Sequence, residues 1–133
     1  MRALVVEDDF ISRWILYRHL QACARCDLAC DGLEAAALFD DALAAGDPYD
    51  LVCLDIMMPG IDGHETLRRL RQAEARHGVA PDQRARVLMT TALEDHGNVR
   101  DAFANSADAY VIKPIEKQQF LDTLQQLGLP LEV

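Results

Sequence analysis

The stretch Leu51-Val52-Cys53-Leu54-Asp55 is the feature from which the fold is best inferred. Its apolar residues are continuous rather than alternating with polar ones, which is typical of a strand buried on both faces of a parallel sheet. Similar short apolar runs occur at residues 3–6, 26–30, 87–90 and 109–112. Because these runs are shorter than an ordinary helix, we expect five strands, most of them fully buried.

Segments with helical spacing lie between and after these runs. Their apolar residues recur at steps of three and four, which places them on one face of a helix. The polar residues 74–86, which include Gly78 and Pro81, predict a long solvated loop before the fourth strand. The inward-facing residues expected in the five helices are Ile15, Leu16, His19, Leu20 and Cys23; Ala35, Leu38, Phe39, Ala42 and Leu43; Leu67, Leu70 and Ala73; Val99, Ala102 and Phe103; and Phe120, Leu121, Leu124 and Leu127.

Strand and helix thus alternate five times along the chain. This alternation predicts an α/β fold in which right-handed helical crossovers join parallel strands. We expect a flavodoxin-like, doubly wound (βα)5 arrangement with five parallel strands, for which the order 2-1-3-4-5 is a common solution. Ligands of such sheets bind beyond the carboxyl ends of the strands, between the first and third. The site should therefore lie where residues 3–6 and 51–54 end.

The overall composition narrows the possible partners. The chain has 133 residues, half of them hydrophobic, which suits a single domain over residues 1–133. Its 13 Lys and Arg against 22 Asp and Glu give a net charge of −9, which argues against nucleic acid as a partner. No apolar stretch approaches the roughly 20 residues that span a bilayer, and the apolar run before Glu7 is too short for a signal peptide. We therefore expect a cytoplasmic protein with no membrane partner.

The four cysteines include a Cys-x-x-Cys pair, Cys23 and Cys26, which could be redox-active or bind a metal. This pair lacks a second ligand pair at zinc-site spacing. Cys53 lies inside one apolar run and Cys30 ends another, which favours small buried thiols. We therefore predict no metal or redox role for the cysteines.

Acidic residues directly follow the first and third expected strands. They are Glu7, Asp8 and Asp9 after the first, and Asp55 after the third. Carboxylates that converge on one edge of a sheet repel one another unless a cation lies between them, so the pattern predicts a divalent metal site. Oxygen ligands with no nearby histidine favour Mg²⁺. Ordinary solvated surface acids are the alternative.

A hydroxyl group and a cation are expected at the same edge. The fourth strand ends at Thr90-Thr91 and the fifth at Lys113-Pro114. Together with a nucleophilic carboxylate and Mg²⁺, these groups could surround the three equatorial oxygens of a phosphoryl group. The pattern therefore predicts a phosphoryl-transfer site, although Lys113 alone could be a chance neighbour of a turn proline.

Four motifs, in order and at strand ends, resemble those of the receiver domains of two-component response regulators. They are residues 4–9, residues 54–63 with their Met-Pro and Asp-Gly pairs, residues 89–92 and residues 110–115. The likeness covers nearly the whole chain. It implies a CheY-like single receiver domain over residues 1–133 with no output domain. Such a protein is not an enzyme, because it catalyses only its own phosphotransfer and autodephosphorylation.

The resemblance implies roles for particular residues at the predicted site. It makes Asp55 the phosphoacceptor and Thr91, rather than Thr90, the switch hydroxyl, and it assigns Lys113 to a phosphoryl oxygen. In such proteins Tyr110 would fill the space that Thr91 vacates on phosphorylation, which changes the face formed by the fourth helix, fifth strand and fifth helix. A cis peptide before the proline that follows Lys113 is also implied.

The resemblance also implies how Mg²⁺ would be held. Asp8 and Asp55 would be direct ligands, Glu7 would support the metal through water, and Met57 would contribute its backbone carbonyl. Asp9 would be a bystander.

The implied phosphoryl donor is a histidine kinase, whereas the output stays open. The phosphorylated face could bind a downstream target protein, or the chain could relay the group to a histidine phosphotransferase. Trp14 and Tyr17 lie away from Leu16 and Leu20 on the first helix, where family kinases and phosphotransferases dock. We therefore expect a partner-contact patch there, with a tryptophan covering a neighbouring loop as the alternative. The sequence leaves the oligomeric state open.

Two other possible functions are less favoured by the sequence. A small aspartyl-phosphate hydrolase on a related sheet would present a second aspartate two residues after the nucleophile, but that position is Met57. An unphosphorylated receiver-like scaffold is disfavoured because every expected chemical group is present.

Overall fold

The computed structural model describes residues 1–92 and 107–131, in which strands and helices alternate as predicted. The fourth expected helix, with Val99, Ala102 and Phe103, lies outside these residues. No helix within them is long and apolar enough to cross a membrane. The elements are β1 (Arg2–Val6), α1 (Phe10–Leu20), β2 (Arg25–Ala29), α2 (Gly32–Ala44), β3 (Leu51–Asp55), α3 (Gly63–Arg76), the short 3-10 helix η1 (Pro81–Gln83), β4 (Arg86–Ala92), β5 (Ala109–Lys113) and α5 (Lys117–Gln126).

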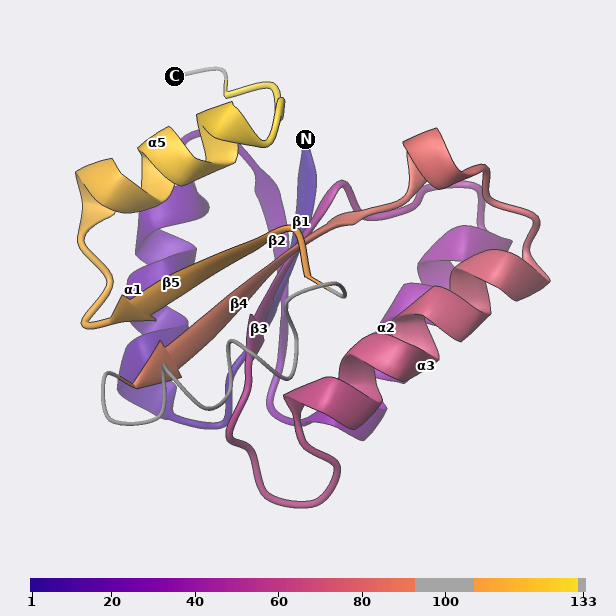
Figure 1. Ribbon diagram of the computed structural model, residues 1–133, viewed down its shortest axis with the longest axis horizontal. Helices are drawn as coiled ribbons and strands as arrows, with labels where there is room; N and C mark the ends of the chain where they lie inside the picture. Colours follow the sequence, from indigo (N-terminus) through magenta and orange to yellow (C-terminus); the bar gives the residue numbers. More distant parts are fainter. Residues whose placement is uncertain (93–106, 132–133) are drawn as a thin grey trace.

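The five strands form one parallel sheet in the order β2-β1-β3-β4-β5, which confirms the predicted fold and strand order. Figure 1 shows α1 and α5 on one face of this sheet and α2 and α3 on the other. In the register, Val6 lies opposite Leu54, and Asp55 lies opposite Thr90. The carboxyl ends of β1, β3 and β4 therefore meet at one edge of the sheet.

Two hydrophobic clusters fill the space between the sheet and its helices. One includes Phe39 and Leu70 and lies on the side of α2 and α3, whereas the other includes Leu16 and Phe120 and lies on the side of α1 and α5. The central strand β3 is buried along its whole length, as its continuous apolar run predicted. Burial does not extend to the edge strand β2, where only Ala29 is buried, because an edge strand has a neighbour on one side only.

Two predicted inward-facing positions are wrong. Ile15 is exposed, because α1 buries Leu16 and Leu20 on a narrower face than the spacing suggested. Cys30 is exposed because β2 ends one residue before it.

Cys23 and Cys53 are buried, and all four thiols are free. Burial raises the pKa of the Cys26 thiol to about 11. A largely protonated Cys26 is a poor nucleophile and metal ligand, so it does not favour a redox or metal role.

Residues 74–86 form a solvated loop only in part. Helix α3 continues to Arg76, and the Glu74 side chain is only 2% exposed. Its Oε1 accepts a hydrogen bond from Arg71 Nη1 at 2.7 Å, and its Oε2 accepts one from the Ala85 backbone N–H at 2.8 Å. Glu74 therefore ties the end of α3 to the start of β4, and the prediction of a loop is wrong at this residue.

A polar network joins the amino-terminal ends of the strands. Arg2 Nη2 lies 3.0 Å from Asp27 Oδ2, and the Tyr49 hydroxyl donates to the same oxygen at 2.6 Å. The Arg2 guanidinium also lies 4.3 Å from the centroid of the Tyr49 ring, at cation–π distance. These contacts connect β1, β2 and the segment before β3 at the edge of the sheet opposite Asp55.

Candidate functional site

Three carboxylates come together where β1 and β3 end. Glu7 continues the sheet ladder beyond β1, because its backbone N–H donates to the Ala29 carbonyl at 3.1 Å, and its side chain is fully buried. Asp55 is the last residue of β3 and is 5% exposed, whereas Asp8 is exposed. One oxygen from each of Glu7, Asp8 and Asp55 lies within 4.8 Å of the others. The structure thus brings together three of the four acids that the sequence placed at one edge.

Asp9 is turned toward helix α1. It is the N-cap residue, and its Oδ2 accepts a hydrogen bond from the Ser12 backbone N–H at 2.8 Å. Its own backbone N–H donates to Glu7 Oε1 at 3.3 Å. Asp9 therefore starts α1 and helps to orient Glu7, and its carboxylate is not in the acidic cluster found among the described residues.

Lys113, at the end of β5, reaches the acidic cluster from the other side. Its Nζ lies 2.9 Å from Glu7 Oε2 and 3.4 Å from Asp55 Oδ1. The Lys113–Pro114 peptide is cis, as the family resemblance implied. The contact with Glu7 was not predicted from the sequence. Glu7 Oε2 forms this ion pair but no aligned hydrogen bond with any described residue, so it retains acceptor capacity.

Burial sets the electrostatics of this cluster. It is the main reason why the pKa of Glu7 rises to about 7, and the nearby Asp55 carboxylate adds to the increase. Burial likewise raises the pKa of Asp55, although Lys113 opposes it. Burial alone would lower the pKa of Lys113, but its two acidic partners outweigh that effect and raise it. One ammonium group thus faces two buried carboxylates, and a further cation would neutralise the excess charge.

We expect the metal-free protein to lose stability through Glu7 as the pH rises from about 4.5 to about 7. The folded state holds the Glu7 proton up to about pH 7, whereas the unfolded chain releases it near 4.5. The stabilisation that the Glu7 proton provides is therefore complete below about pH 4.5. It is lost as the pH rises through about 7. It amounts to at most about 3 kcal/mol in the free energy of unfolding.

Urea unfolding with a chelator, at several pH values, measures this contribution. Glu7→Gln is the matched control, because an amide does not titrate. The unfolding free energy of the wild type, relative to that of this variant, should fall as the pH rises from about 4.5 to about 7. A difference that stays constant between pH 4.5 and 7 would contradict the assignment.

The two threonines at the end of β4 are both buried but occupy different positions. Thr90 lies opposite Asp55 in the register, and its hydroxyl has no hydrogen-bond partner within residues 1–92 and 107–131, a feature that the sequence did not reveal. The Thr91 hydroxyl donates to the Ala92 carbonyl at 3.2 Å. Met89 pairs with Tyr110, and both belong to the cluster on the α2 and α3 side. Strand alternation places Thr91 on that same face, with Tyr110.

The start of α1 exposes a group of apolar side chains beside the acidic cluster. Trp14 is 49% exposed, and its ring centroid lies 5.9 Å from that of Tyr17. Phe10 and Ile11 are 65% and 60% exposed. We call Phe10, Ile11, Trp14 and Ile15 the α1 patch. Sequence reasoning missed Phe10 and Ile11, although two large apolar residues directly after an acidic motif were a usable signal.

Gly63 allows the loop after β3 to fold back against the phosphoacceptor candidate. Its backbone N–H donates to the Ile56 carbonyl at 2.9 Å. A Cβ atom at this position would lie 2.7 Å from Ile56 Cα and 2.8 Å from the Asp55 carbonyl oxygen. Only a residue without a side chain fits here, so Gly63 helps to fix the backbone at Asp55. Met57, in the same loop, is 59% exposed.

The sequence of this chain is similar to those of known proteins. VanRB, a regulatory protein of Enterococcus faecalis, is 36% identical over 124 residues, which cover 93% of this chain and 50% of VanRB. Probable histidine kinase 2 of Oryza sativa subsp. indica is 31% identical over 134 residues, which cover 93% of this chain and 12% of the kinase. The chain thus spans half or less of the length of these two relatives.

A solved structure shows the same fold. The receiver domain of the histidine kinase CKI1 from Arabidopsis thaliana, complexed with Mg²⁺, superposes with a TM-score of 0.81 at 23% identity, covering 95% of this chain and 90% of that one. A family model described as the response regulator receiver domain matches residues 3–125. Because that match covers nearly the whole chain, this protein belongs to the response regulator receiver domain family of two-component signalling.

Proposed function

We propose that Asp55 accepts a phosphoryl group from a histidine kinase, so that the protein acts as a phosphoacceptor response regulator. The observation that carries this proposal is the position of Asp55, buried at the end of β3, close to Glu7 and Asp8 and 3.4 Å from Lys113. A carboxylate nucleophile beside a cation and further acids is the arrangement that phosphoryl transfer to an aspartate requires. We place the exchange in the cytoplasm, where histidine kinases draw on ATP.

Each of these residues would have its own role in phosphoryl transfer. An oxygen of Asp55 forms a bond to phosphorus while the bond from phosphorus to the donor's imidazole nitrogen breaks. The Lys113 ammonium would move from Glu7 to a phosphoryl oxygen and stabilise its negative charge. The Thr91 hydroxyl would then turn toward another oxygen, and Tyr110, on the same face of the sheet, would occupy the space that it leaves.

The residues present fit a Mg²⁺ ion. The cluster offers only hard oxygen donors, it carries more negative charge than Lys113 neutralises, and a buried Glu7 oxygen keeps acceptor capacity. Asp8, Asp55 and the Met57 carbonyl would hold the ion, with Glu7 acting through water. Mg²⁺ would supply charge neutralisation for the phosphoryl oxygens. The Mg²⁺ complex of the CKI1 receiver domain, which has the same fold, supports this choice of metal.

Intact mass spectrometry after incubation with acetyl phosphate tests the proposed chemistry. We expect a phosphoryl adduct on the wild-type protein in the presence of Mg²⁺ and at least about a hundredfold slower formation in excess chelator, as expected when a metal clamp on the phosphoryl oxygens is removed. Absence of an adduct with Mg²⁺, or equal rates with and without chelator, would overturn the proposal.

Receiver domains are typically phosphoacceptors rather than enzymes, and we infer the same for this chain. A hydrolase would need an acid two residues after Asp55, where Met57 exposes a thioether instead. Whether the phosphorylated protein binds a target or passes the group to a histidine phosphotransferase depends on its partners. The face proposed for the output includes the expected fourth helix, whose residues lie outside the described part of the chain.

The α1 patch is the surface that we propose for contact with the kinase. It lies directly after the acidic residues, so a protein seated on it could present a phosphohistidine to Asp55. We expect Trp14→Ala to slow phosphotransfer from a histidine kinase that phosphorylates the wild-type protein by about tenfold, because a large aromatic anchor is lost. The rate with acetyl phosphate should not change.

Leu33→Ala is the matched control for this experiment. Leu33 is similarly exposed, at 56%, but lies on α2, across the sheet from α1. Its variant should accept the phosphoryl group from the kinase at the wild-type rate. If Trp14→Ala did so as well, the α1 patch would not be the contact surface.

A further inference from the structure

Basic residues are concentrated in and after α3, although the protein as a whole is acidic. Residues 68–86 contain six of the 13 Lys and Arg residues and two of the 22 acids. The stretch therefore has a positive formal charge within a chain whose net charge is −9. Neither the phosphoacceptor site nor the α1 patch includes any of these six residues. The six are Arg68, Arg69, Arg71, Arg76, Arg84 and Arg86.

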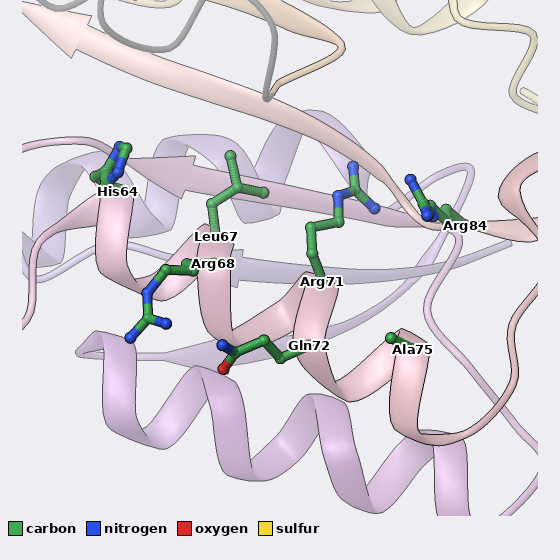
Figure 2. A pocket seen from close by; sticks show the side chains of 7 residues that line it. All are labelled: His64, Leu67, Arg68, Arg71, Gln72, Ala75 and Arg84. Atoms are coloured by element: carbon green, nitrogen blue, oxygen red, sulfur yellow. The ribbon is translucent and has the colours of Figure 1, made fainter.

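Three of these arginines, Arg68, Arg71 and Arg84, line a groove along α3. The groove has a volume of about 460 Å³, and no carboxylate is among the described residues that line it. In Figure 2, His64 and Arg84 lie at its two ends, with Arg68 on one side and Arg71 on the other. An adjoining cavity of about 360 Å³ shares Arg68 and Gln72 and adds Arg69 and Arg76. We call the first cavity the α3 groove. Its lining residues are His64, Leu67, Arg68, Arg71, Gln72, Ala75 and Arg84.

Arg71 is the fixed part of the groove. Its guanidinium lies between Glu74 Oε1, at 2.7 Å, and Asp108 Oδ2, at 3.3 Å, and donates to the Ala85 carbonyl at 3.0 Å. These partners, from α3, the segment before β4 and the segment before β5, hold the Arg71 side chain in one orientation. Its charge is largely balanced locally, so the attraction for an anion must come from the other arginines.

Arg68 and Arg84 provide the cationic groups that are available to a ligand. Arg68 is oriented by two hydrogen bonds to Glu65, at 2.8 and 2.6 Å, but its side chain remains 55% exposed. Glu65 also pairs with Arg69, so one carboxylate serves two guanidinium groups. Arg84 is exposed and makes no ion pair with the residues that the structure describes. Guanidinium groups recognise carboxylates through paired hydrogen bonds, and one that is already oriented loses less entropy on binding.

We propose that the α3 groove binds an acidic segment of a partner protein. Carboxylates of the segment would contact Arg68 and Arg84, and an apolar side chain would rest on Ala75, the exposed apolar residue of the groove. Residues 64–75 span about 17 Å along the helix, which matches a short peptide or one face of a helix. A long polyanion such as nucleic acid would also meet the acidic remainder of the protein, which would repel it.

Fluorescence anisotropy with a labelled acidic peptide tests the groove. The probe is a peptide of glutamate and alanine about 12 residues long, enough to span the groove as a helix, used at low salt without Mg²⁺ or acetyl phosphate. We expect saturable binding that the double variant Arg68→Gln/Arg84→Gln weakens by about tenfold. Arg25→Gln, which removes a charge from an arginine 67% exposed on β2, should bind like wild type. A glutamine version of the peptide should not bind.

Three outcomes would overturn the proposal. The first is equal affinity of the wild type and the double variant, with circular dichroism showing that both are folded. The second is equally tight, equally arginine-dependent binding of a single-stranded oligonucleotide, which would indicate a general polyanion site. The third is self-association of the wild type in light scattering that the double variant loses, which would make a second copy the occupant. The double variant should still react with acetyl phosphate, so failure here is distinguishable from failure of the Asp55 chemistry.

Discussion

Asp55→Asn is expected to take up no phosphoryl group from acetyl phosphate in the presence of Mg²⁺. The amide nitrogen and oxygen of asparagine cannot act as the carboxylate nucleophile, and one of the three clustered carboxylates is lost. In the metal-free state the same variant should unfold at a higher urea concentration than wild type. Asp55 raises the pKa of Glu7, so its removal leaves one carboxylate, Glu7, facing one ammonium, Lys113, inside the protein.

Asp9→Asn is the control that separates loss of the nucleophile from a general loss of negative charge. Asp9 lies at the same edge of the sheet but points to α1, and asparagine is an equally good N-cap residue. This variant should form the adduct like wild type in intact mass spectrometry. An adduct on Asp55→Asn at the wild-type rate would mean that another residue, such as Asp8, is the acceptor.

Gly63→Ala is expected to affect both stability and phosphorylation. The new methyl group would lie 2.7 Å from Ile56 Cα and 2.8 Å from the Asp55 carbonyl oxygen, and backbone atoms cannot rotate away as a flexible side chain can. We expect a loss of about 3 kcal/mol in the free energy of unfolding, at the upper end for overpacking by one methyl group. A shift of about 1 Å at Asp55 would also slow phosphorylation by about a hundredfold.

Gly46→Ala is a suitable comparison because its effect should come from backbone conformation alone. Gly46 has a φ of 72°, and a Cβ atom there would meet nothing within 4 Å. Alanine at such a positive φ costs about 1 kcal/mol, and phosphorylation should be unchanged. If urea unfolding and acetyl phosphate kinetics gave the same results for both variants, the close packing at Gly63 would have no special role.

The central strands and the edge that carries the site were predictable because their causes are local in the sequence. A strand covered on both faces, such as Leu51–Asp55, must be apolar along its length, and this shows in any short window. In a parallel sheet, residues that follow different strands are brought to the same edge by topology alone. The convergence of Glu7, Asp8 and Asp55 therefore followed from the strand pattern, without knowledge of any side-chain conformation.

The features that were missed depend on partners distant in the sequence. The burial of Glu74 rests on the backbone N–H of Ala85, and the exposure of Cys30 on where the edge strand stops. The pairing of Lys113 with Glu7 rather than Asp55 alone reflects distances of 2.9 and 3.4 Å that no spacing rule encodes. Periodicity reports which face a residue lies on, whereas these contacts depend on how side chains from separate elements meet.

Substitutions in the network of Arg2, Asp27 and Tyr49 should affect stability without affecting phosphorylation. The network lies about one strand length, or about 16 Å for five residues, from Asp55. Substitutions there should lower the melting temperature while the folded fraction keeps its reaction with acetyl phosphate. Substitutions at one end of the sheet can therefore change the thermal stability of the protein while selection acts separately on the signalling chemistry at the other end.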